Sequence, residues 1–145
     1  MKQVLFSFFL FFIGTPTFAQ QWNTNVDIAT QKAVELDKPI LLVFKGSDWC
    51  GPCIKLDRDV FSTDSFRTYA KGNFVLLEAD FPKRKKNALT EEQQIHNNNL
   101  ADKYNPNGIF PLVVILNNEG EKLGETGYFK SSPSEYINHL NSFIK

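Results

Sequence analysis

Cys50 and Cys53 are the only two cysteines of this 145-residue chain, and Gly51 and Pro52 stand between them. An apolar run that begins at Ile40 precedes the pair, and apolar residues at helical spacing follow it. A C-x-x-C placed where a strand passes into a helix is typical of a redox motif, because a helix N-terminus favours a thiolate. We therefore expect Cys50 to be the nucleophile and Cys53, about one helical turn further on, to form a disulfide with it.

Other common uses of paired cysteines fit the sequence less well. A zinc site needs three or four protein ligands, and His96 and His139 do not have the spacing of a zinc finger, so we expect no metal. The residue after the second cysteine is Ile54, whereas haem attachment needs histidine there. An inert structural disulfide is a further alternative, although so small a loop constrains the unfolded chain little.

Two segments resemble the thioredoxin superfamily, and the resemblance extends from about residue 27 to residue 145. One is the W-C-G-P-C motif at residues 49–53, and the other is the Ile-Phe-Pro segment at residues 109–111. The flanking residues 46–50 and 78–82 are more similar to exported bacterial thioredoxin-like proteins than to small cytosolic thioredoxins. The resemblance implies an α/β fold, a thioredoxin-like three-layer α/β/α sandwich with a central mixed β-sheet.

The resemblance also implies roles for individual residues. Cys50 and Cys53 would be catalytic, with no cofactor. In the family the proline that corresponds to Pro111 follows a cis peptide bond and lies beside the reactive sulfur, and the residue before it pairs with an extended target segment. The substrate-binding residues expected on this basis are Trp49, Gly51, Pro52, Phe110 and Pro111.

One position departs from the family pattern. Thioredoxins hold a buried acid six residues before the first cysteine, and an ungapped count places Phe44 there. The same count places Leu76 at the family's neighbouring lysine. We therefore expect Cys53 to lack the usual proton acceptor, with Lys45 and Glu78 as nearby residues that could replace it.

The composition favours one globular domain, and the N-terminal segment favours export. Lys plus Arg and Asp plus Glu number 16 each, so nothing favours nucleic-acid binding. Residues 1–19 have a positive start, an apolar stretch and small residues before Gln20, which predicts a signal peptide cleaved after Ala19. An uncleaved N-terminal anchor is the alternative. The mature domain would be residues 20–145, in the periplasm or otherwise exported.

The apolar patterns predict the elements that position the motif. We expect helices from about residue 26, from residue 51 or 52, from residue 90 to residue 104 and from residue 132, with a short helix ending near residue 73. Buried strands are expected at residues 40–44, 74–77 and 112–116, the last in a hairpin with residues 122–127.

One run of positive charge stands out, and it consists of Lys83, Arg84, Lys85 and Lys86. Such a run indicates a solvated loop or, less commonly, a docking site. Trp22 is expected to dock the N-terminal segment, and both histidines are expected to be exposed.

These residues predict an exported thiol–disulfide oxidoreductase. It would reduce disulfides of envelope proteins through a Cys50/Cys53 dithiol–disulfide cycle. Its partners would be disulfide-containing client proteins and a membrane-linked thiol electron donor, and it would act as a monomer. Two alternatives stay open. One is a disulfide oxidase or isomerase in envelope protein folding, and the other is a non-catalytic thioredoxin-like module that binds peptides.

Overall fold

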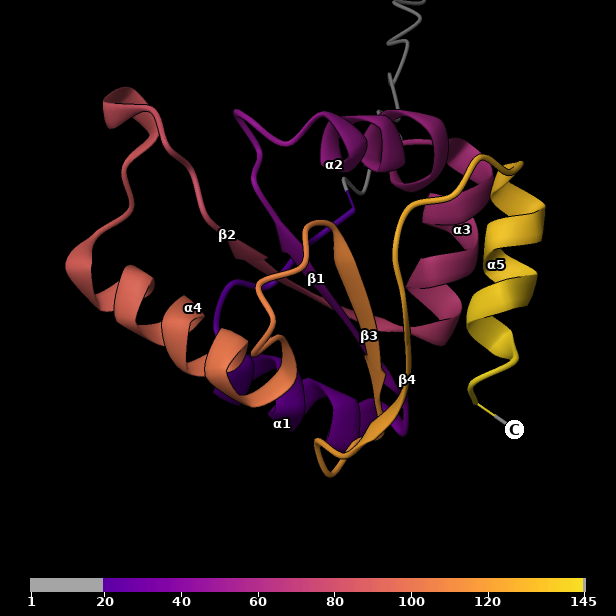
Figure 1. Cartoon of the computed structure of the whole chain (residues 1–145). Helices are drawn as coiled ribbons and strands as arrows, with labels where there is room; N and C mark the ends of the chain where they lie inside the picture. The colour runs from indigo at the N-terminus through magenta and orange to yellow at the C-terminus, as the bar shows by residue number, and fades with distance from the viewer. Residues whose placement is uncertain (1–19, 145) are drawn as a thin grey trace, which may run out of the picture.

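The computed structural model describes residues 20–144 (Figure 1). Its α-helices are α1 (Val26–Leu36), α2 (Gly51–Leu56), α3 (Asp64–Asn73), α4 (Glu91–Tyr104) and α5 (Pro133–Asn141). Its strands are β1 (Ile40–Lys45), β2 (Val75–Asp80), β3 (Leu112–Leu116) and β4 (Lys122–Thr126). A π-helical turn, η1 (Asp57–Phe61), and a 3-10 turn, η2 (Lys85–Asn87), complete the described elements. None of the described helices is long and apolar enough to cross a membrane. The expected signal peptide lies outside the described residues.

The four strands form one mixed sheet in the order β2-β1-β3-β4. The central strand β1 is parallel to β2 and antiparallel to β3, and β3 is antiparallel to β4. The carboxyl ends of β1 and β2 therefore lie at the same end of the sheet. The redox motif follows β1 at that end, with α2 above it in Figure 1.

Alternation along the buried strands divides the core into two layers. Leu41 and Val43 of β1 face helices α2, α3 and α5, whereas Ile40, Leu42 and Phe44 face α1 and α4. Both faces of the sheet are covered (Figure 1), which explains why β1 and β3 are apolar at nearly every position. The predicted three-layer α/β/α sandwich is thereby confirmed.

The ends of the helices and strands are set by local contacts, and one strand is longer than predicted. Asn25 caps α1, since its side chain accepts the backbone N–H groups of Asp27 and Ile28. Strand β2 continues three residues beyond the predicted apolar run, to Asp80, and the polar side chains of this extension, Glu78 and Asp80, are half-buried on the edge strand. Helix α5 begins with a capping box, in which Ser132 and Glu135 are bonded to each other's backbone.

The two histidines are less exposed than expected. The ring of His96 accepts the backbone N–H of Val26 at 3.0 Å, and this bond ties α4 to the start of α1. His139 packs edge-on against Phe129 and Phe143, and it bonds Thr126 at 3.1 Å. Both side chains are half-buried and serve packing between elements, which their polar sequence neighbours did not indicate.

Candidate redox site

Cys50 and Cys53 form a disulfide at the N-terminus of α2. Cys50 is the N-cap residue of the helix, and its Sγ accepts the backbone N–H of Cys53 at 3.2 Å. Pro52 lies in the first turn, where its missing N–H leaves no partner unsatisfied. The two cysteines are 4% and 6% exposed, so in the disulfide form exposure does not distinguish them. The helix terminus does distinguish them, because only the Cys50 sulfur receives a free N–H of the first turn.

A small cavity lies behind the disulfide, on the side of Cys53. Its wall includes Cys53, Lys45 and Glu78, together with Pro111 and the ring of Trp22. Lys45 Nζ lies 2.6 Å from Glu78 Oε2, and the two side chains are 26% and 22% exposed. The ion pair of Lys45 and Glu78 thus lines the same cavity as Cys53. A carboxylate in this place is suited to accept a proton from Cys53.

The structure corrects the ungapped count that assigned the family's acid and lysine to Phe44 and Leu76. Phe44 is fully buried against α1 and α4, whereas Leu76 packs with α3 and α5 on the opposite face of the sheet. Side chains on opposite faces cannot form a pair. The face that carries Leu76 is the one that also carries Lys45 and Glu78, and there a charged pair is present.

An aromatic shelf adjoins the motif. The ring of Trp49 packs at 5.6 Å from that of Phe110, which packs at 5.4 Å from that of Phe81. Trp49 Nε1–H donates to the carbonyl of Phe81 at 2.7 Å, and the ring remains 39% exposed. Gly46 permits this arrangement, because a Cβ there would collide with the Trp49 ring. Trp49 is therefore held rigidly while one part of its surface stays available to a partner.

The segment before β3 completes the shelf. The Phe110–Pro111 peptide bond is cis, as the resemblance implies, and Pro111 is buried beside the cavity of Cys53. The backbone N–H and C=O of Phe110 have no hydrogen-bond partner among the described residues. Gly51 and Pro52 are exposed at the start of α2. The structure thus gathers all the sequence-predicted site residues at one end of the sheet.

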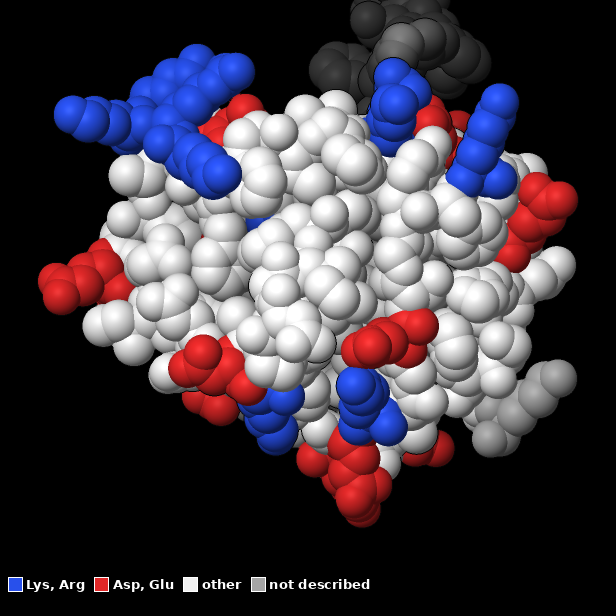
Figure 2. Space-filling model, in the orientation of Figure 1, with Lys and Arg blue, Asp and Glu red and all other residues white. Residues whose placement is uncertain are grey.

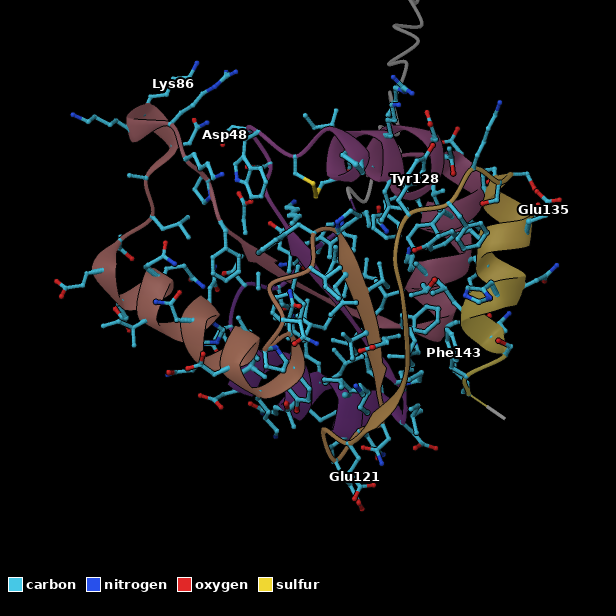
Figure 3. All side chains as sticks on the ribbon, viewed as in Figure 1. Asp48, Lys86, Glu121, Tyr128, Glu135 and Phe143 are labelled. Atoms are coloured by element: carbon cyan, nitrogen blue, oxygen red, sulfur yellow. A yellow bond between two sulfur atoms is a disulfide. The ribbon has the colours of Figure 1, made fainter. Side chains whose placement is uncertain are left out.

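Asp48 connects the motif to the loop between β2 and α4. Its carboxylate accepts the backbone N–H groups of Lys83 at 2.9 Å and Arg84 at 3.0 Å, and the side-chain amide of Asn87 at 2.9 Å. The bond from the Lys83 backbone, above all, holds the pKa of Asp48 below its usual value. Lys83 Nζ in turn lies 3.8 Å from the centre of the Trp49 ring. Figure 3 shows Asp48 beneath the loop that carries Lys86.

Sequence reasoning missed one wall of the site. Asn23 pairs with Leu77 at the edge of β2, and this short bridge brings Trp22 against Phe61 at a ring distance of 5.5 Å. Trp22 does dock the N-terminal segment as expected, but it also lines the cavity of Cys53. An isolated bridge of one residue has no sequence pattern that would predict it. Within residues 20–144, no group of three or more His, Cys, Asp or Glu side chains could hold a metal ion.

Comparison with known proteins gives relatives over most of the chain. A family model for thioredoxin-like proteins matches residues 21–118. The disulfide bond reductase DsbH of Chlamydia pneumoniae is 33% identical over 125 residues, which cover 86% of this chain and 73% of that protein. The thioredoxin-related protein DsbJ of the same organism is 32% identical over 108 residues, 74% of this chain but 30% of that longer protein.

A solved structure of a DsbH oxidoreductase superposes on this chain with a TM-score of 0.79. Its sequence identity is 28%, and the superposition covers 99% of this chain and 94% of that one. The fold, the helix-capping disulfide and the sequence relatives agree with one another. Cys50 and Cys53 give the chain the redox pair of a thiol–disulfide oxidoreductase, and the chain belongs to the thioredoxin-like family.

Proposed function

We propose that this protein is an exported thiol–disulfide oxidoreductase that reduces disulfides of envelope proteins. The position of Cys50 carries the proposal, since its sulfur caps α2 and receives the Cys53 N–H. A thiolate is the attacking species in thiol–disulfide exchange, and this position favours one. The reducing direction is supported by Gly51 and Pro52, which resemble the reducing thioredoxins, and by the name of the DsbH relative.

The proposed cycle has two exchange steps. The Cys50 thiolate attacks one sulfur of a client disulfide, which forms a Cys50–client bond and releases the other client sulfur as a thiolate. Cys53 then gives its proton to Glu78 and attacks Cys50 Sγ, so that the Cys50–Cys53 bond forms and the second client thiolate leaves. The client gains two electrons, and the protein is left as the disulfide described above. A membrane-linked thiol donor would return two electrons to it.

Client binding is assigned to the shelf around the motif. Trp49 offers an exposed aromatic surface, and the unpaired backbone of Phe110 offers a donor and an acceptor to an extended client segment. Pro111, the residue after Phe110, lines the same cavity as Cys53. The protein would act in this way as a monomer.

The reduction potential of the Cys50–Cys53 pair tests the direction. A value near the thioredoxin value of about −270 mV supports the reductase, whereas one near the DsbA value of about −120 mV supports the oxidase or isomerase. Insulin reduction with a chemical thiol donor tests the activity itself. Cys50→Ser should abolish it, and Cys53→Ser should trap clients as mixed disulfides in the native host. If the wild type reduces insulin no faster than Cys50→Ser, the protein is not a reductase, and the peptide-binding module is the better explanation.

A further inference from the structure

A cluster of positive charge stands beside the redox site. The segment from Lys83 to Lys86, hereafter the basic loop, has four consecutive cationic side chains, all exposed. The whole chain has equal numbers of basic and acidic residues, so this cluster is a local concentration rather than a general excess. Figure 2 shows it as a blue projection at the upper left, where Figure 1 shows the loop between β2 and α4.

No ion pair in the described part of the chain neutralises this charge. The side chains of Arg84, Lys85 and Lys86 take part in no ion pair among residues 20–144. Asp48 is the acid that contacts the loop, but both of its oxygens bond backbone N–H groups or the amide of Asn87. The carboxylate therefore fixes the loop backbone and attracts the Arg84 guanidinium without forming an ion pair, and it leaves the side chains of Lys85 and Lys86 free. Lys86 points away from the domain into solvent (Figure 3).

The basic loop is also fixed in position relative to the reactive sulfur. Asp48 stands two residues before Cys50, so the residue that holds the loop belongs to the motif itself. Lys83 packs on the ring of Trp49, which is the residue directly before Cys50. A client whose disulfide reaches Cys50 across the Trp49 shelf must therefore pass next to the cations of the loop.

We propose that the basic loop is a docking site for acidic segments of client proteins, which it holds beside the disulfide to be reduced. The inference rests on the proposed function and names its substrate class: disulfide proteins with Asp or Glu clustered on one side of the reactive cysteine. Charge complementarity at the rim of an interface raises the rate of encounter and selects partners. A loop in which Arg84, Lys85 and Lys86 form no ion pair, yet which is anchored to the motif, fits this use.

The test compares two short peptides, each with one internal disulfide and differing only in flanking residues, Glu in one and Gln in the other. The wild type should reduce the Glu peptide with a kcat/KM about five to ten times higher at low salt, through a lower KM. The preference should vanish at about 1 M salt, where the Debye length is ~3 Å. The basic-loop variant, in which Arg84, Lys85 and Lys86 are each replaced by Ala, should reduce both peptides equally, at the wild-type rate for the Gln peptide.

A matched control removes the same charge elsewhere. Lys38 and Lys122 lie at the end of the sheet opposite Cys50. Lys103 lies in the last turn of α4, next to Tyr104, whose hydroxyl donates to Gly120 in the β3–β4 hairpin. Replacing these three lysines with Ala should leave the preference for the Glu peptide intact. An equal loss in this control would make net charge, rather than the basic loop, the cause and would overturn the proposal.

Two further outcomes would separate the explanations. Equal turnover of the Glu and Gln peptides by the wild type overturns the docking proposal alone, whereas no turnover of either peptide overturns the proposed function with it. Vesicles containing phosphatidylglycerol probe the other anionic surface. If the basic-loop variant loses vesicle binding but keeps the preference for the Glu peptide, the loop binds membrane rather than clients, and the proposal is wrong.

Discussion

Lys45 and Glu78 form an ion pair across the parallel strands β1 and β2, with Nζ and Oε2 2.6 Å apart, in the wall of the cavity that Cys53 also lines. Both side chains are about three-quarters buried, so the pair is sheltered but still reached by water. The pair stands on the face of the sheet that packs against α2. In the proposed cycle Glu78 accepts the Cys53 proton, and Lys45 positions that carboxylate.

Replacing Glu78 with Gln should slow turnover at pH 7 by about tenfold, because a positioned proton acceptor is lost. The deficit should shrink as pH rises towards about 8.5, where a free thiol ionises without help. Insulin reduction against pH, with a chemical reductant in excess, measures it. Glu125→Gln is a suitable control, since Glu125 also pairs with a lysine, Lys122, but on exposed β4. Identical pH profiles for Glu78→Gln and the wild type would assign the proton transfer to another group.

Replacing Phe44 with Asp should unfold the protein rather than supply a proton acceptor. The ring is fully buried between the sheet and helices α1 and α4, away from Cys53. Loss of the ring and burial of a carboxylate should lower the free energy of unfolding by at least about 4 kcal/mol. Phe44→Leu should cost only about 1 kcal/mol, because it conserves most of the packing. Denaturant titration measures both values, and a stable, faster Phe44→Asp variant would contradict this placement.

Cys50 should react about ten times faster than Cys53 with iodoacetamide in the reduced protein, because the N-terminus of α2 favours its thiolate. The small exposed fractions of the two cysteines do not predict this order, so the experiment isolates the effect of the helix terminus. Mass spectrometry of the partly labelled protein gives the two rates. Preferential labelling of Cys53 would reverse the roles assigned to the two sulfurs.

Acid should release the basic loop from the motif. The Lys83 backbone bond, followed by the bonds from Asn87 and Arg84, keeps the pKa of Asp48 below its ordinary value. A lowered carboxyl pKa means that Asp48 stabilises the folded loop above the unfolded pKa of about 3.9, and that this contribution is lost as pH falls through the folded pKa. Amide exchange at Lys83 and Arg84, corrected for intrinsic rates, should therefore rise in acid.

Asp48→Asn provides the matched variant for this experiment. Its amide keeps one acceptor oxygen but does not titrate, so exchange at Lys83 should be faster than in the wild type at pH 6 and should not change with acid. The backbone N–H of Ser132, which the Glu135 carboxylate accepts at 2.7 Å, is an internal control, because its exchange should respond to acid equally in the wild type and in Asp48→Asn. An acid response at Lys83 that persists in Asp48→Asn would show that another group controls the loop.

The mature protein should begin at Gln20 when it is isolated from the cell envelope. The apolar stretch and the small residues before Gln20 predict cleavage after Ala19. N-terminal analysis by mass spectrometry should find Gln20, in part cyclised, and no Met1. A membrane-bound protein that retains Met1 would favour the uncleaved anchor instead.

The sequence by itself was sufficient for the fold and for the reactive pair. Continuous apolar runs such as residues 40–44 and 112–116 require a sheet covered on both faces, and the helices between them supply the cover. Cys50 and Cys53 were recognisable because a C-x-x-C at a helix start has few other uses. These features are local, since spacing along the chain alone decides them.

The surroundings of the pair were decided by the tertiary structure. A one-residue change in strand register moves a side chain to the other face of a sheet, so a count along the sequence could not tell Phe44 from Lys45 as the neighbour of Cys53. The contact of Trp22 with the cavity depends on one bridge between Asn23 and Leu77, far apart in the chain. The link from Asp48 to the basic loop likewise spans 35 residues, and only folding brings its partners together.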